Sequence, residues 1–173
     1  RSGCDEKACL GESGLTRSGG EAGRSVLERG WSRPTCDING IWGGYTGEGS
    51  KTVIASHASA KLSCRLVPDQ DPDRIVAAIE RFFRDRLPAD CRLEFHDHGR
   101  GRPVRVATAS PWLQAARRGI EDVFGKPPAL IGCGGSIPIT APSREILGLD
   151  VLFVGFGLDD DRVHSPNEKF DLV

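Results

Sequence analysis

Two segments of the chain alternate regularly between apolar and polar residues, which is the pattern of strands with one buried face. The first covers residues 58–66 and the second covers residues 91–98. Between them, Asp71-Pro72 is a helix start signal, and apolar residues recur at helical spacing as far as Leu87. This order of strand, helix and strand predicts half of a split βαβ layer.

The pattern breaks at residues 99–108, and the C-terminal part is different. Ser110-Pro111 predicts the start of a second amphipathic helix, which Gly125 ends. Short strands are predicted at residues 129–131 and, as an almost unbroken apolar run, at residues 151–156, with a helix ending near Gly148 between them. Continuous apolar strands joined by a helix predict parallel pairing in a buried α/β sheet.

The first fifty residues hold about half of the 22 glycines and show little periodicity. A short helix is predicted around Ser25 to Arg29. Residues 40–50 contain Trp42 and Tyr45 among five glycines, a composition typical of a loop or tight hairpin. The first twenty residues give no assignment.

His164 is the histidine best placed to bind a metal. An Asp-rich turn at residues 159–161 brings it to the C-terminal side of the apolar 151–156 strand, where open α/β sheets bind their ligands. Ser165-Pro166-Asn167-Glu168 is a capping box that predicts a helix start. His164 is therefore either a metal ligand or a loop histidine beside a helix cap, and one histidine alone cannot hold a catalytic metal.

A second candidate site is the glycine-rich turn at residues 132–138. Gly134-Gly135 allows a sharp turn before Pro138, so backbone N–H groups and the Ser136 hydroxyl could bind a phosphate or a carboxylate. Neither nucleotide-binding motif, G-x-G-x-x-G or G-x-x-x-x-G-K-[ST], is present. The turn could equally be a simple connection between a strand and a helix.

Arg65 and His98 lie on the polar faces of the two alternating segments. If those segments pair, both side chains point to one side of the sheet, where the guanidinium could bind a carboxylate in a bidentate manner. His96 and His98 are also spaced to chelate a metal, the weaker of the two interpretations.

Composition narrows the function class. The chain has 23 basic and 24 acidic residues, so no broad attraction to nucleic acid or anionic lipid is expected. No apolar run reaches membrane-spanning length. Six cysteines without C-x-x-C spacing favour a reducing, cytoplasmic setting over a disulfide framework. The absence of methionine and the late capping box lead us to expect an internal fragment.

Five segments occur in a fixed order that is similar to a known family: Trp31–Gly40, Gly47–Ile54, Lys61–Pro68, Gly134–Pro138 and His164–Lys169. They resemble the carnosinase-like dimetal peptidases, the family of cytosolic nonspecific dipeptidase, acetylornithine deacetylase and succinyl-diaminopimelate desuccinylase. The resemblance covers roughly residues 24–170, with the dipeptidase branch most similar. Two departures from the family pattern are Ala55, where Pro is frequent, and Cys133, where dipeptidases often carry Glu.

The resemblance implies an α/β enzyme with two divalent metal ions, zinc or manganese, and a lid domain that forms a homodimer. Residues 1–100 would be an incomplete α+β lid of the split βαβ, ferredoxin-like type, and residues 101–173 would be the C-terminal part of the catalytic sheet. The remaining metal ligands and the general base would precede Arg1, so that none of the catalytic residues lies in this fragment, which would be truncated at both ends.

By matching motifs, His164 would ligate one metal. The substrate-binding residues would be Arg65, His98, Gly135 and Ser136, which grip the substrate's terminal carboxylate, and Thr52, which reaches the partner subunit's site. The expected function is hydrolysis of amide bonds in dipeptides or N-acyl amino acids with a free carboxylate, with the fragment alone inactive. The alternatives are a non-catalytic dimerisation or binding module and, less favoured, a nucleotide-binding domain built on residues 132–136.

Overall fold

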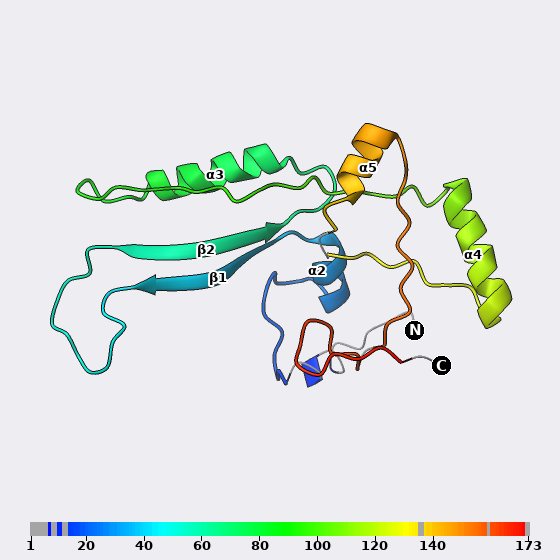
Figure 1. The fold of residues 1–173 in the computed structure, drawn as a ribbon, viewed down its shortest axis with the longest axis horizontal. Helices are drawn as coiled ribbons and strands as arrows, with labels where there is room; N and C mark the ends of the chain where they lie inside the picture. The colour runs from blue at the N-terminus through cyan, green and yellow to red at the C-terminus, as the bar shows by residue number, and fades with distance from the viewer. Residues whose placement is uncertain (1–6, 8–9, 12–13, 135–136, 159, 172–173) are drawn as a thin grey trace.

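The structure, a computed structural model, describes residues 7, 10–11, 14–134, 137–158 and 160–171. Within these residues the elements follow in the order α2 (Val26–Ser32), β1 (Thr35–Gly43), β2 (Ala58–Arg65), α3 (Pro72–Arg84), α4 (Pro111–Phe124) and α5 (Thr140–Leu147). The two strands form a long hairpin at one end of the molecule, whereas α4 lies at the other end (Figure 1). The mixture of helices and strands agrees with the expected fold class.

The sheet formed by the described residues has two strands. β1 pairs with β2 in antiparallel register, from Thr35 opposite Arg65 to Gly43 opposite Ala58. A register shift between Ile38 and Gly40 leaves Asn39 as a bulge. The strand predicted at 58–66 is confirmed, whereas β1 was not predicted, because its sequence lacks regular alternation.

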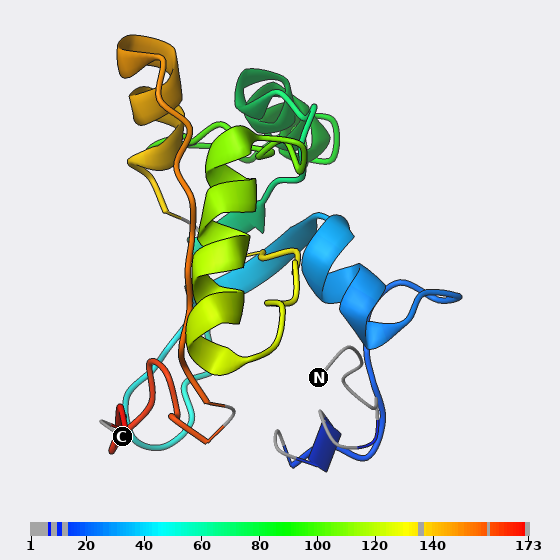
Figure 2. The ribbon, with the colours of Figure 1, turned by 90° about the vertical axis from the view of Figure 1, so that its right-hand side faces the viewer.

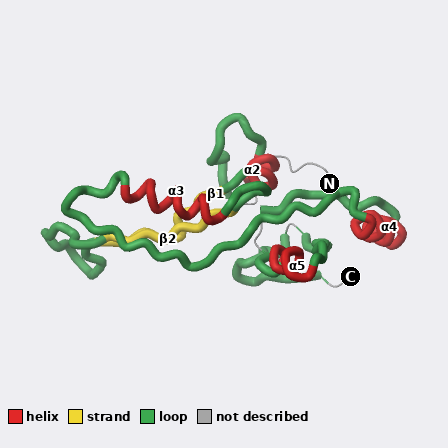
Figure 3. The backbone as a smooth tube through the Cα atoms, turned by 90° about the horizontal axis from the view of Figure 1, so that it is seen from above, coloured by secondary structure: helices red, strands yellow, loops and turns green. Residues whose placement is uncertain are grey.

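α3 lies alongside the hairpin, as the views from the front and from above both show (Figures 1 and 3). Its start is the predicted one: the Asp71 carboxylate accepts a hydrogen bond from the Asp73 backbone N–H at 2.8 Å, and Pro72 occupies the first turn. Ile75 and Ile79 of its apolar stripe are half-buried. The predicted helix is confirmed.

Three other predicted helices are also present. α2 begins at Ser25 with a full capping box formed with Glu28. α4 and α5 end at Gly125 and Gly148, whose φ angles of 68° and 65° are those of left-handed C-caps. Ser110, in contrast, makes no side-chain capping bond at the start of α4.

Three predicted strands are wrong for the described residues. Residues 91–98, 129–131 and 151–156 run in irregular conformation and pair with no described segment. Residues 151–156 pass beside α4 (Figure 2), where the rings of Phe124 and Phe156 lie 5.9 Å apart. Phe156 is still 57% exposed. Apolar patterning shows that a segment can be buried, but a strand also needs a hydrogen-bonded neighbour.

Large apolar side chains are exposed over much of the described structure, and none is fully buried there. Among the apolar residues that the structure describes, only Pro72 and the small Ala141 are buried. Exposed large residues occur on the hairpin, on α4 and along residues 151–158. So many exposed large apolar side chains are typical of surfaces that another polypeptide segment covers.

Candidate functional site

Arg65 contacts the glycine-rich loop. It ends β2, and its guanidinium donates a hydrogen bond to the Gly134 carbonyl oxygen at 2.9 Å, across 69 positions of sequence. The contact joins two of the segments that the sequence predicts to bind a carboxylate. Ser136 and Gly135, the other predicted residues of this loop, lie outside the described residues.

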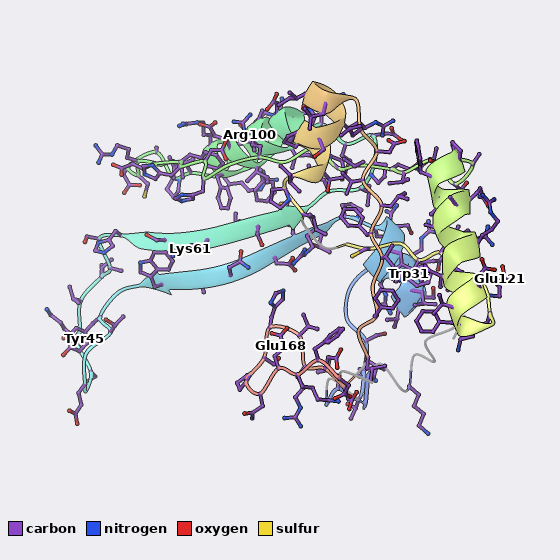
Figure 4. The ribbon with its side chains drawn as sticks, turned by 45° about the vertical axis from the view of Figure 1, so that its right-hand side comes forward. Trp31, Tyr45, Lys61, Arg100, Glu121 and Glu168 are labelled. Carbon is purple, nitrogen blue, oxygen red and sulfur yellow. The ribbon has the colours of Figure 1, made fainter. Side chains whose placement is uncertain are left out.

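The glycine-rich loop packs tightly against α2. A Cβ atom built on Gly132 would lie 2.6 Å from the Trp31 Cβ, and one built on Gly134 would lie 2.9 Å from the Gly30 carbonyl oxygen. Neither position has room for a side chain without moving backbone. Trp31 lies beside this loop in Figure 4. From the sequence, these glycines were interpreted only as turn residues. Their close packing against α2 was missed, because the spacing of residues along the chain does not show which distant segment lies beside them.

His98 lies in a turn fastened to the start of α3. The Arg100 guanidinium donates to the carboxylates of both Asp97 and Asp73, and the Gly99 N–H donates to Asp97 at 3.1 Å. The hydrogen bond from Arg100, followed by that from Gly99, lowers the pKa of Asp97 below its ordinary value. The turn therefore has a defined position, although the strand predicted to carry His98 is absent from the described residues.

Arg65 and His98 were expected to share one face of a sheet. That expectation is wrong, because it required their two segments to pair as strands. β2 pairs with β1, and residues 91–98 are not its neighbour in the described sheet. Both histidines of the 96–98 segment are exposed. Arg65 and His98 are therefore held in place by separate contacts. Arg65 bonds to the glycine-rich loop, and the turn that carries His98 is held by the ion pairs of Arg100.

His164 lies in a tight turn, not at a helix start. Its backbone has a φ of 63°, and Asn167 has a φ of 62°, both in the left-handed region. The Glu168 carboxylate accepts from the His164 N–H at 3.1 Å, one residue before the predicted cap position at Ser165. The helix predicted from Ser165 is wrong, and the His164 side chain is exposed.

Asp161 anchors the turn that carries His164. It is only 3% exposed, and its carboxylate accepts from the Leu158 N–H at 2.7 Å, while its carbonyl accepts from the Lys169 N–H at 3.0 Å. Lys169 also pairs with Asp160, which lowers the pKa of that carboxyl. The run of aspartates in the sequence predicted this turn. The structure adds that Asp161, which is buried, holds it.

The turns that hold His164 and His98 are apart. Glu168 and Arg100, which mark them in Figure 4, lie on opposite sides of the hairpin. Within the described residues no group of three or more His, Cys, Asp or Glu side chains could hold a metal ion. Thr52 is exposed in the loop between the strands, at the centre of a tight turn in which the Val53 N–H donates to the Lys51 carbonyl at 3.0 Å.

Sequence comparison adds the family. Residues 6–91 match the model of the peptidase dimerisation domain of M20 enzymes. The Cys-Gly metallodipeptidase DUG1 of Saccharomyces cerevisiae is 32% identical over 85% of this chain and 31% of its own length. This chain is homologous to the M20 metallopeptidases. The human Beta-Ala-His dipeptidase is 31% identical over 84% of the chain and 29% of its own length.

Solved M20 structures agree with this family. The M20 metallo-carboxypeptidase Sso-CP2 of Sulfolobus solfataricus superposes with a TM-score of 0.82 at 29% identity, over 96% of this chain and 38% of its own. The dipeptidase Dug1p of Saccharomyces cerevisiae gives a TM-score of 0.71 at 30% identity, over 94% of this chain and 34% of its own. The chain thus spans about a third of the length of these M20 relatives.

The homologues are metallodipeptidases by name, which implies divalent metal cofactors for the M20 fold. A dimerisation domain implies association between copies. In the described part of the chain, no helix has both the length and the apolar character needed to cross a membrane.

Proposed function

We propose that this chain is part of a metal-dependent hydrolase that cleaves the amide bond of dipeptides or N-acyl amino acids carrying a free carboxylate. The observation that carries the proposal is the hydrogen bond from Arg65 to Gly134. It holds a guanidinium beside a glycine-rich turn, and both groups suit a carboxylate. The kinship to dipeptidases at 31–32% identity supports the same substrate class.

Arg65, His98, Gly135 and Ser136 bind the substrate's terminal carboxylate in this proposal. Thr52 extends from the hairpin loop to the partner subunit's site. Fixing the carboxylate sets the position of the scissile bond, which is a contribution to orientation and not to bond breaking. The anchored turns around His98 and the glycine-rich loop support such a positioning role, because a binding group held in place loses little entropy when substrate arrives.

His164 is the one metal ligand that this proposal assigns to the chain. An exposed imidazole on a turn fixed by Asp161 fits that role, but the described residues contain no complete ligand set. The two ions, zinc or manganese, therefore need ligands beyond this set. When bound, such ions lower the pKa of a coordinated water molecule.

The proposed division of the chain places a lid and dimerisation domain at residues 1–100 and a catalytic portion at residues 101–173. Association through the lid into a homodimer is supported by the exposed apolar residues of the hairpin, where Ile41 is 76% and Ile54 is 94% exposed. A cytoplasmic setting is supported by the free thiols of Cys36, Cys64 and Cys91.

Arg65→Ala in the complete enzyme tests the carboxylate site. We expect a KM for dipeptides raised by roughly 100-fold with a lowered kcat, because losing a charge-assisted bond costs about 1.5–3 kcal/mol and misplaces the substrate. Arg92→Ala is the matched control, because Arg92 is 85% exposed and pairs with the nearby Glu94. Steady-state hydrolysis with added manganese measures both, and an unchanged kcat/KM for Arg65→Ala removes this residue from the site.

His164→Ala in the complete enzyme tests the metal assignment. We expect loss of about one metal ion per subunit by elemental analysis, because a site that loses one of few ligands binds its ion much more weakly. His57→Ala is the control, an exposed histidine that contacts the neighbouring Ser56. Full metal content in His164→Ala would contradict the assignment.

The second candidate is a non-catalytic dimerisation module, favoured by the match of residues 6–91 to the dimerisation domain. The two candidates make different predictions for the 173-residue chain by itself. Because its described residues lack a grouped ligand set, we expect association without measurable dipeptide hydrolysis. Hydrolysis by this chain alone would show that its own residues complete the site.

A further inference from the structure

Cys36 and Cys64 lie directly opposite each other in the antiparallel hairpin. Opposed residues in such a ladder project from the same face of the sheet. Their Cα atoms are typically about 4.5–5.5 Å apart, which lies within the range of about 4.4–6.8 Å spanned by disulfides. Both thiols are free in this structure.

The two sulfurs differ in exposure. Cys36 is exposed to solvent, and Cys64 is half-buried. Burial, then a hydrogen bond to Cys36, then the negative charges of Cys36 and Asp37, raise the pKa of the Cys64 thiol to about 11. Near neutral pH Cys64 is therefore protonated, and the exposed Cys36 is the sulfur that an oxidant in solution reaches.

We propose that Cys36 and Cys64 form a reversible oxidation site that peroxide converts into a cross-strand disulfide. Cys36 attacks hydrogen peroxide, becomes a sulfenic acid and releases one water molecule. The Cys64 sulfur then attacks the sulfenic sulfur, an S–S bond forms, and hydroxide leaves with the thiol proton as a second water molecule. Two thiols lose two electrons in total, and the peroxide gains them.

The second step joins two sulfurs whose residues the ladder already holds opposite each other. A sulfenic acid carries no charge, so the first step removes one cause of the raised pKa of Cys64, whereas burial, the largest cause, remains. The disulfide then closes residues 36–64 into a ring that contains the whole loop between the strands. It lies one residue before Arg65, whose ladder partner is Thr35, so oxidation fastens the end of β2 that holds the glycine-rich loop.

Peptide mapping of the intact protein tests this site. The protein is treated with a small excess of hydrogen peroxide, alkylated, digested without reductant and analysed by mass spectrometry. We expect a peptide joining Cys36 to Cys64 in roughly tenfold excess over any other linked pair, and dithiothreitol should abolish it. The oxidised protein should also melt at a temperature higher by about 4 °C or more, because the closed ring constrains the unfolded chain.

Cys64→Ser and Cys91→Ser are the paired variants. With Cys64→Ser the linked peptide and the melting shift should disappear and Cys36 should be recovered as sulfinic acid, whereas Cys91→Ser should behave as the unchanged protein. Cys91 is exposed, and its thiol contacts the neighbouring Asp90. The proposal is overturned if links to Cys91 or to other cysteines match the Cys36–Cys64 link, or if Cys36 reaches sulfinic acid in the unchanged protein with Cys64 still reduced.

Discussion

The hairpin with α3 and the region of α4 and α5 use the same helix signals, yet among the described residues only the first region contains paired strands. α3 starts at Asp71-Pro72, and α4 ends at Gly125, both as the local sequence dictates. β2 has β1 as its ladder partner. The apolar residues 151–156 have no described partner and stay in irregular conformation.

This difference shows that local sequence predicts helices better than it predicts strands. A helix satisfies its backbone hydrogen bonds within one segment, so capping residues and a 3.6-residue period suffice to predict it. A strand satisfies them through another segment. Leu62 in β2 is half-buried, whereas Phe153, from an even more apolar segment, is 56% exposed. Hydrophobicity alone does not place a strand.

The two regions meet at the glycine-rich loop, where Arg65 of β2 donates to Gly134. We expect the largest effect from Gly132→Val, because even a Cβ there would lie 2.6 Å from that of Trp31. Overpacking of this kind costs about 1–3 kcal/mol, and displacing a positioning group by 1 Å costs on the order of 100-fold in rate. Chemical denaturation and dipeptide kinetics of the complete enzyme measure the two effects.

Gly119→Ala is the matched control for that substitution. Gly119 lies within α4, and a Cβ there meets nothing within 4 Å. Alanine should stabilise the helix by about 1 kcal/mol and leave activity unchanged. If Gly132→Val behaves like Gly119→Ala, the close approach of the loop to α2 does not exist in solution.

A medium effect is expected at the helix starts. Asp71→Ala removes the hydrogen bond to the Asp73 N–H and should lower the free energy of unfolding by about 1 kcal/mol. Ser110→Ala at the start of α4 should be neutral or stabilising, because its hydroxyl is buried without a hydrogen-bond partner. Urea unfolding followed by circular dichroism compares the two variants, and equal losses would show that both serine and aspartate cap their helices.

The smallest effect concerns pH. Arg100 lowers the pKa of Asp97, and Lys169 lowers that of Asp160. A carboxyl with a lowered pKa in the folded state stabilises it above the unfolded pKa of about 3.9. That contribution is lost as pH falls through the lower, folded value. The ion pairs in both turns should therefore weaken only in acid below the ordinary Asp range.

Carboxyl chemical shifts measured by NMR check this pH dependence. Arg100→Gln should raise the pKa of Asp97 toward its ordinary value and leave that of Asp160 unchanged, and Lys169→Gln should do the reverse. A parallel shift of both groups in either variant would mean that the two turns do not titrate independently.

Part of the candidate site was also predictable from the sequence. The order of motifs identified the family, because residue type and spacing can be read directly along the chain. Arg65 and the glycine-rich loop, both predicted to bind a carboxylate, are in hydrogen-bond contact, and their part in substrate binding stays a prediction. The shared face for Arg65 and His98 was wrong, since it assumed that residues 91–98 pair with β2. The helix from Ser165 was wrong because Glu168 bonds to the His164 N–H and left-handed residues interrupt the turn.

By itself, the sequence determined the four helices α2 to α5, the β2 strand and the kinship to M20 metallopeptidases, because caps, periodicity and ordered motifs act over a few residues at a time. Only the tertiary structure decided that β1 pairs with β2, that Cys36 lies opposite Cys64, and that Arg65 reaches Gly134. These contacts join residues 15 to 69 positions apart. Hydrogen bonds and packing between such distant segments depend on how the whole chain folds. A pattern of neighbouring residues does not contain that information.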